Sequence, residues 1–312
     1  LNIIEALQRY FGHAQFRPGQ EALIEALLSG RDALGIMPTG GGKSICYQLP
    51  AMVLDGVTLV VSPLISLMKD QVAALVQSGV AAAYINSSLT ASQTREALRR
   101  AEQGRYRIIY VAPERLHTPR FQQVASRLRI ALVAVDEAHC VSQWGQDFRP
   151  DYLQIASFLD GLAVRPPVGA FTATATQRVR NDICTLLRLQ SPYECVTGYD
   201  RPNLYFEVRQ PKKRDDELLS LLHARRDMSG IVYCATRKNV DKVCDLLRKD
   251  GHAAARYHAG LPDALRQAAQ DDFQHDRAQV MVATNAFGMG IDKSNVGYVI
   301  HYNMPRNLES YY

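Results

Sequence analysis

Residues 33–49 read ALGIMPTGGGKSICYQL and predict a short strand, a glycine-rich turn and a helix in direct succession. This is the setting of a phosphate-binding loop, because glycines let backbone N–H groups turn inward around phosphate oxygens while the helix presents its positive N-terminus to them. Lys43 would reach the β- and γ-phosphates, and the Ser44 hydroxyl would hold Mg²⁺. Met37 stands where the usual pattern has its first glycine, so the loop alone leaves open a glycine-rich turn beside an incidental lysine.

Residues 130–139 read IALVAVDEAH and supply the second half of a nucleotide site. The unbroken apolar run predicts a central buried strand, and the two carboxylates after it would project into the crevice where open α/β sheets bind ligands. Asp136 suits a magnesium ligand, and Glu137 suits the base that orients and deprotonates an attacking water. An Asp-Glu pair can also cap a helix, but such a cap does not need this long apolar lead-in.

These two motifs together predict nucleotide hydrolysis. The predicted catalytic residues are Lys43, Asp136 and Glu137, and Ser44 and Asp136 are the predicted metal ligands. The predicted nucleotide-binding residues of the loop are Thr39, Gly40, Gly41, Gly42, Lys43 and Ser44.

Strand-like runs alternate with amphipathic helical patterns along the whole chain, which predicts an α/β fold with mainly parallel sheets. The first set of predicted strands covers residues 33–37, 57–62, 108–111, 130–135 and 168–172. The second set covers residues 231–234, 253–257, 279–283 and 296–301, separated by helical patterns at 238–249 and 263–273. Glycine, proline and charge gather at 197–203 and 209–214, so we expect two domains, residues 1–198 and 199–312.

Composition excludes several classes of protein. Hydrophobic residues make up 47% and charged residues 21% of the 312 residues, which is typical of globular chains rather than disordered ones. The net charge of +5 permits a polyanionic partner. No apolar run approaches the roughly 20 residues of a membrane span. The six cysteines form no C-x-x-C pair, which argues against a disulfide framework and a zinc site. The start lacks an initiator Met and a signal peptide, so we expect a trimmed chain that is not secreted.

Further motifs add a resemblance to a known family. The strings are FGHAQFRPGQ at 11–20, VSPLISLMKDQ at 61–71, YVAPERL at 110–116, FTATAT at 171–176, GIVYCATR at 230–237, YHAGL at 257–261 and VATNAFGMGIDK at 282–293. Together with the two nucleotide motifs they closely resemble the RecQ family of superfamily-two DNA helicases, of bacterial type, over essentially the whole chain. The resemblance implies two tandem RecA-like P-loop domains, the second incomplete at its C-terminus.

The resemblance also implies roles for individual residues. Gln20 would read the adenine edge with its amide, Arg17 would hydrogen-bond or stack on the ring, and Asp292 would face the nucleotide from the second domain. The implied contacts with a single nucleic-acid strand outside the aromatic-rich loop are Ser62, Ser66, Asn86, Arg237 and Thr284.

The stretch CVSQWGQDFRPDY, residues 140–152, follows the carboxylates directly and holds the only tryptophan of the chain. Trp144, Phe148 and Tyr152 offer flat faces for bases, and Arg149 offers a cation. Aromatic side chains more often fill a core, but the polar residues between these favour an exposed loop. The family has an aromatic-rich loop here, which by resemblance senses single-stranded DNA and couples it to hydrolysis. The predicted contacts are Ser142, Gln143, Trp144, Phe148 and Arg149.

The expected function is therefore an ATP-dependent DNA helicase of repair and recombination that uses ATP and Mg²⁺ and acts on single-stranded and partially duplex DNA. The resemblance alone implies 3′-to-5′ movement. It also implies arginine fingers beyond Tyr312, so we expect this chain to bind ATP and hydrolyse it slowly. We expect a monomer in the bacterial cytoplasm, associated with the chromosome. Two alternatives stay open: an RNA helicase of the same superfamily, and a nucleotide-gated single-strand-binding module without turnover.

Overall fold

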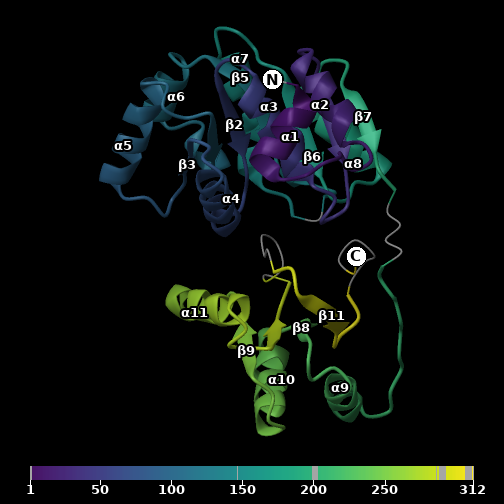
Figure 1. The fold of residues 1–312 in the computed structure, drawn as a ribbon. Coiled ribbons are helices and arrows are strands. Elements are labelled where there is room, and N and C mark those ends of the chain that lie inside the picture. Colours follow the sequence, from purple (N-terminus) through teal and green to yellow (C-terminus); the bar gives the residue numbers. More distant parts are fainter. Residues whose placement is uncertain are drawn as a thin grey trace. The chain divides into compact units, whose positions relative to one another are not determined.

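The computed structural model describes residues 2–145, 147–198, 203–285, 287, 293–305 and 311. The chain divides into two compact units, unit 1 from Leu1 to Arg201 and unit 2 from Pro202 to Tyr312 (Figure 1). The predicted domain boundary after residue 198 stays a prediction. Asp292, the predicted nucleotide contact of the second domain, lies outside the described residues.

The described part of unit 1 contains a seven-stranded sheet in the order β3-β4-β2-β5-β6-β1-β7, and all its strand pairs are parallel. The strands are β1 (Ala33–Ile36), β2 (Val57–Val61), β3 (Ala82–Ile85), β4 (Ile108–Val111), β5 (Ile130–Val135), β6 (Val168–Thr172) and β7 (Tyr193–Val196). The two nucleotide motifs follow β5, the central strand of this sheet, and β1, which lies next to the edge strand β7; only β6 separates β5 from β1.

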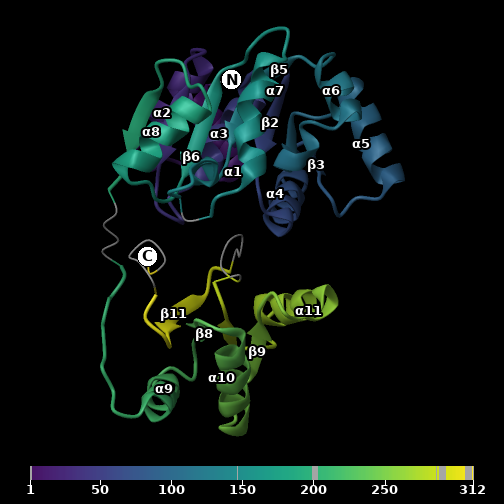
Figure 2. The ribbon, with the colours of Figure 1, turned by 180° about the vertical axis from the view of Figure 1, so that it is seen from behind.

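Helices cover both faces of this sheet. They are α1 (Ile3–Phe11), α2 (Gln20–Leu28), α3 (Lys43–Val53), α4 (Ile65–Gln77), α5 (Ala91–Glu102), α6 (Pro119–Ala125), α7 (Ile155–Asp160) and α8 (Gln177–Leu186), with short 3-10 helices η1 (Pro113–Arg115), η2 (Ala138–Val141) and η3 (Pro150–Gln154). Side chains of α2, α3 and α4 share one hydrophobic core, and those of α5, α6, α7 and α8 share another. Figures 1 and 2 show these two groups from opposite sides.

Burial on both faces explains why the strands are apolar without alternation. In β5, Val133 and Val135 enter one core, whereas Leu132 and Ala134 enter the other. Successive side chains of a strand point to opposite faces, so a strand covered on both sides needs apolar residues at every position.

One buried carboxylate joins the amino ends of three strands. Asp32 is 2% exposed and accepts hydrogen bonds from Arg165 Nη2 at 2.7 Å, from Val168 N at 2.8 Å and from Gln190 N at 2.6 Å. These partners lie before or at β6 and before β7, the two neighbours of β1. A buried charge held by this many donors fixes the start of β1, whose other end carries the phosphate-binding loop.

Unit 2 is smaller and follows the same plan. Its described part has a four-stranded parallel sheet in the order β11-β8-β10-β9. The elements are α9 (Arg214–His223), β8 (Ser229–Tyr233), α10 (Arg237–Lys249), β9 (Ala254–Tyr257), α11 (Asp263–Gln274), β10 (Val280–Ala283) and β11 (Val296–His301). Side chains of α9 and α10 enter one core and Phe273 of α11 enters the other.

All nine predicted strands are present, so the predicted α/β class with parallel sheets is confirmed. The sequence did not reveal β3 and β7, which are the two edge strands of the larger sheet. Within the described residues, no helix combines the length and apolar character that a membrane span requires.

Candidate nucleotide site and nucleic-acid interface

The glycine-rich loop joins β1 to α3 as predicted. Gly40 and Gly42 have φ values of +78° and +81°, a left-handed conformation that suits residues without a side chain. Gly42 is the N-cap of α3 and offers no side-chain cap, so the first N–H groups of the helix are available to an anion. Lys43 Nζ donates to the Met37 carbonyl at 3.1 Å, and Ser44 follows in the first helical turn.

Arg17 and Gln20, the predicted adenine contacts, donate hydrogen bonds to backbone carbonyls of this loop. The Gln20 side chain is buried, and its Nε2 donates to the Gly42 carbonyl at 3.0 Å while its Oε1 accepts from Arg17 N at 2.8 Å. The Arg17 guanidinium donates to the Gly40 carbonyl. Both side chains therefore contact the backbone of the phosphate-binding loop, and their recognition of a base stays a prediction.

Asp136 and Glu137 follow β5 at the carboxyl edge of the sheet. Asp136 is 5% exposed, and its Oδ1 accepts a hydrogen bond from Glu137 N at 3.1 Å. Glu137 has a left-handed backbone, with φ of +48° and ψ of +47°. A glutamate in this conformation carries strain of about 1–3 kcal/mol, which surrounding structure must maintain. The Tyr152 hydroxyl contributes by donating to the Asp136 carbonyl at 2.9 Å.

The two carboxylates have opposite electrostatic environments. Burial, and then repulsion by Glu137, raises the pKa of Asp136 above its usual range, although Lys43 opposes this rise. Burial alone would raise the pKa of Glu137, but the hydrogen bond and charge of His139 and the charge of Lys43 together lower it. A buried carboxylate with too little positive charge beside it fits a divalent cation, and Mg²⁺ prefers such oxygen donors. Asp136 therefore fits this ion, and Ser44 as a second ligand stays a prediction.

His139 connects Glu137 to the neighbouring strand. Its Nδ1 lies 2.8 Å from Thr172 Oγ1 and 3.3 Å from Glu137 Oε2. Because the Thr172 hydroxyl donates to the Thr174 carbonyl at 3.2 Å, it accepts from His139, which therefore carries its proton on Nδ1. The sequence motifs contain His139 and Thr172, but nothing in the sequence indicated that they form a pair.

The aromatic-rich loop presents Trp144 to solvent. The residue is 62% exposed, and the guanidinium carbon of Arg178, in α8, lies 3.6 Å from the centroid of the indole ring. Gln143 is exposed and Phe148 is half-buried. Tyr152 is different, because it is fully buried. The prediction that Tyr152 offers a face to bases is therefore wrong, and the alternative of a core aromatic holds for it.

Polar side chains fix the base of this loop. Ser142 is buried, where its hydroxyl donates to Asp182 Oδ2 at 2.6 Å and accepts from Trp144 N at 3.1 Å. Arg149 forms an ion pair with Asp147, and its Nη1 donates to the Pro63 carbonyl at 3.0 Å. The loop is thereby attached to α8 and to the segment after β2.

Of the other five predicted contacts with a nucleic-acid strand, three directly follow β-strands and two lie in the first turns of helices. Ser62 follows β2, Asn86 follows β3 and Thr284 follows β10, and all three are buried. Ser66 is half-buried in the first turn of α4, and Arg237 is exposed in the first turn of α10. Contact of these five residues with a nucleic acid stays a prediction.

Comparison with known families matches this architecture. Residues 17–183 match the DEAD/DEAH box helicase family, and residues 213–312 match the helicase conserved C-terminal domain. The chain belongs to the DEAD/DEAH box helicase family.

Sequence relatives show which helicases within this family the chain resembles. The chain is 45% identical over 313 residues to the ATP-dependent DNA helicase RecQ of Haemophilus influenzae, covering 99% of this chain and 50% of that protein. It is 47% identical over 307 residues to the RecQ helicase of Bacillus subtilis, covering 98% of this chain and 52% of that protein. The resemblance to RecQ helicases is confirmed: this is a RecQ-type helicase core. The chain spans about half the length of these relatives.

Solved structures support the fold. Yeast Dbp5 bound to RNA and ADP BeF3 has a TM-score of 0.75 at 18% identity, covering 98% of this chain and 79% of that one. The Mycobacterium smegmatis helicase Lhr bound to single-stranded DNA and AMP-PNP has a TM-score of 0.73 at 19% identity, covering 95% and 43%. At this identity the likeness shows the fold alone, and it agrees with the predicted tandem RecA-like domains.

Proposed function

We propose that the protein is an ATP-dependent DNA helicase that couples hydrolysis of Mg-ATP to movement along a single strand and to duplex unwinding. One observation carries the proposal. The catalytic carboxylates Asp136 and Glu137 and the exposed Trp144 belong to one short segment, residues 136–144, and this segment follows a strand in the same sheet as the phosphate-binding loop.

The mechanism assigns a separate task to each group of the site. The N-terminus of α3 and Lys43 bind the phosphates, and Mg²⁺ held by Ser44 and Asp136 supplies positive charge when bound. Glu137 accepts the proton of the attacking water, and its lowered pKa keeps it ionised for that task. His139 orients Glu137, because its ring is fixed by the hydrogen bond to Thr172.

Coupling to the strand runs through the aromatic-rich loop. A base stacked on Trp144 would shift the backbone of residues 142–144, which is anchored through Ser142 to Asp182. The same segment of chain begins at Glu137 and His139, so the shift would reach the catalytic carboxylate. Arg149 joins this loop to Pro63, beside the predicted strand contact Ser62. Stacking and phosphate contacts of this kind bind single strands with little sequence preference.

The proposed substrates are single-stranded and partially duplex DNA, and the proposed direction is 3′ to 5′. The protein would act as a monomer on the bacterial chromosome in the cytoplasm, in repair and recombination. These assignments rest on the names of the relatives and on the family resemblance. An RNA helicase, and a single-strand-binding module without turnover, are the alternatives that the experiments must separate.

Glu137→Gln tests the catalytic assignment. The amide cannot accept a proton from water, so we expect the rate of ATP hydrolysis to fall at least about 100-fold, with the dissociation constant for ATP little changed. Phosphate release and binding of a fluorescent ATP analogue measure the two quantities. Hydrolysis at the wild-type rate would contradict the assignment.

Trp144→Ala tests the coupling loop. We expect stimulation of ATP hydrolysis by single-stranded DNA to fall at least about tenfold, because loss of a base-stacking face costs about 1–3 kcal/mol, while ATP binding is retained. Tyr205→Ala is the control, since Tyr205 is an exposed aromatic, at 84%, outside the predicted strand contacts. Stimulation by RNA rather than DNA would favour the RNA helicase, and unchanged stimulation by DNA in Trp144→Ala would contradict the coupling role of Trp144.

A further inference from the structure

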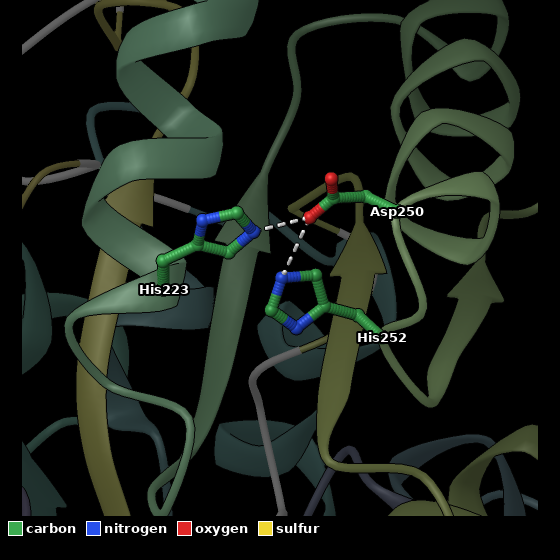
Figure 3. Close-up of side chains that lie close together, drawn as sticks. All are labelled: His223, Asp250 and His252. Atoms are coloured by element: carbon green, nitrogen blue, oxygen red, sulfur yellow. Dashed lines mark hydrogen bonds and ion pairs between the residues drawn. The ribbon is translucent and has the colours of Figure 1, made fainter.

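Two histidines and an aspartate lie close together in unit 2, at the amino ends of its β-strands. The predicted nucleic-acid contacts of this unit, Arg237 and Thr284, lie at the carboxyl ends. His223 is the last residue of α9, Asp250 is the C-cap of α10, and His252 lies just before β9 (Figure 3). His223 Nε2 lies 2.5 Å and His252 Nε2 lies 3.4 Å from the same oxygen, Asp250 Oδ2. One ligand atom from each residue lies within 4.8 Å of the others.

His252 is the unusual member of this cluster. Its side chain is 5% exposed, and its Nε2 is buried without a hydrogen-bond partner among the described residues. The contact with Asp250 has an ion-pair distance but makes no hydrogen bond. An unpaired buried nitrogen costs about 1–3 kcal/mol, so natural proteins seldom retain one without a ligand or a water for it.

A backbone turn fixes the relative positions of Asp250 and His252. After α10 the chain makes a Schellman turn, in which His252 N donates to the Leu247 carbonyl at 2.9 Å and Gly251 N donates to the Arg248 carbonyl at 3.1 Å. Gly251 has a φ of +88°, as this turn requires. The turn places Asp250 and His252 on either side of one glycine, so their relative position does not depend on flexible side chains alone.

We propose that His223, Asp250 and His252 form a binding site for a divalent transition-metal ion of the zinc type. Two imidazole nitrogens and one carboxylate oxygen are ligands that zinc accepts at about 2.0–2.2 Å, with water in the fourth position. Tetrahedral ligands at that distance lie about 3.3 Å apart, close to the 3.4 Å between His252 and Asp250.

His223 must move outward to join the site. Its present distance of 2.5 Å from Asp250 is that of a hydrogen bond, and the metal ion would replace the shared proton. The His223 side chain is 45% exposed and has room for this shift. Arg226 contributes positive charge near Asp250 and His252, which weakens the affinity of the site for a cation.

The site would be structural. It joins α9 to the turn between α10 and β9, and it lies at the amino ends of the strands rather than at the edge with the predicted strand contacts. The cysteine pattern argued against a zinc site made of thiolates, but it has no bearing on histidine and aspartate ligands.

Titration of the untagged, ATP-free chain with Zn²⁺ tests the proposal. We expect one ion per chain by calorimetry, a higher Tm with Zn²⁺ because a ligand of the folded state stabilises it, and the visible absorption of tetrahedral Co²⁺ when Co²⁺ replaces Zn²⁺. Effects of Mg²⁺, including those of the predicted Asp136 site, should be the same in wild type and in His223→Gln, since Mg²⁺ prefers oxygen ligands.

Variants identify the ligands. His223→Gln alters an exposed side chain and should weaken Zn²⁺ binding at least tenfold without loss of folding, and Asp250→Asn and His252→Gln should do the same. His275→Gln, in an exposed residue of the same unit, is the matched control and should bind Zn²⁺ normally. Absence of binding by the folded chain, or binding unchanged in His223→Gln and Asp250→Asn, would overturn the proposal. If His252→Gln does not fold, His223→Gln decides.

Discussion

At the scale of single residues, the position of Asp136 favours magnesium binding at the expense of the stability of the fold. Its carboxylate is buried next to Glu137, and the cost of this position raises its pKa. The same burial removes competing water from a magnesium ligand. We therefore expect that part of the folding stability is given up at this position for the sake of the metal site.

Asp136→Asn tests this expectation through pH. An acid whose pKa is higher in the folded chain holds its proton more tightly there, so the free energy of unfolding falls as pH rises above the ordinary aspartate pKa near 4. Asparagine does not ionise, so the free energy of unfolding of the variant does not fall in this way as pH rises. The variant should melt several degrees above wild type at pH 8 without Mg²⁺, since 1 kcal/mol shifts Tm by about 2–4 °C, and the gap should shrink toward pH 5.

The control for this measurement is Asp151→Asn, which alters an exposed carboxylate and should leave the Tm unchanged at both pH values. A variant Asp136→Asn that melts below wild type at pH 8 would show that the ionised carboxylate stabilises the fold.

Sequence patterns predicted the identities of the site residues better than their partners. Asp136 and Glu137 could be found because a long apolar strand leads directly to them. The pairing of His139 with Thr172 could not, because 33 residues and a strand crossover separate the two. Tyr152 was misread because its polar neighbours indicate a loop, whereas its ring turns back into the core and its hydroxyl reaches the Asp136 carbonyl.

At the scale of elements, the phosphate-binding loop depends on Gly42. A Cβ there would overlap Gln20 Nε2, whereas a Cβ on Gly40 meets nothing within 4 Å, and both residues have nearly the same positive φ. Each change to alanine costs about 1 kcal/mol of backbone strain. Gly42→Ala should cost a further 1–2 kcal/mol or so, because the buried Gln20 amide loses its partners.

Urea unfolding of the two variants measures this difference, and binding of a fluorescent ATP analogue should be at least tenfold weaker in Gly42→Ala. Equal stability of Gly40→Ala and Gly42→Ala would show that Gln20 does not support the loop.

The sequence predicted all the interior strands of the two sheets but missed β3 and β7, the edge strands of the larger sheet. The strands β2 and β5 are buried on both faces and read as apolar runs. The edge strands β3, with sequence AAYI, and β7, with sequence YECV, are only partly buried and contain residues of low strand propensity. Their strand conformation comes from pairing with β4 and β1 rather than from their own composition.

At the scale of the whole molecule, the charge of +5 is modest, so we expect binding of single-stranded DNA to depend on local phosphate contacts. Affinity should fall with salt, with a log–log slope of about −0.7 for each phosphate neutralised, or about −2 to −3.5 for three to five contacts. Fluorescence anisotropy with oligonucleotides of different sequence measures this slope. A slope near zero, or strong dependence on sequence, would contradict binding through phosphates and stacked bases.

The central claim is that the protein hydrolyses ATP in response to a single strand of DNA. Steady-state ATP hydrolysis by this chain, measured with and without single-stranded DNA, tests it most directly. We expect single-stranded DNA to raise the rate of phosphate release by the folded protein. Failure of the folded protein to release phosphate with single-stranded DNA present would contradict the helicase and favour a nucleotide-gated binding module.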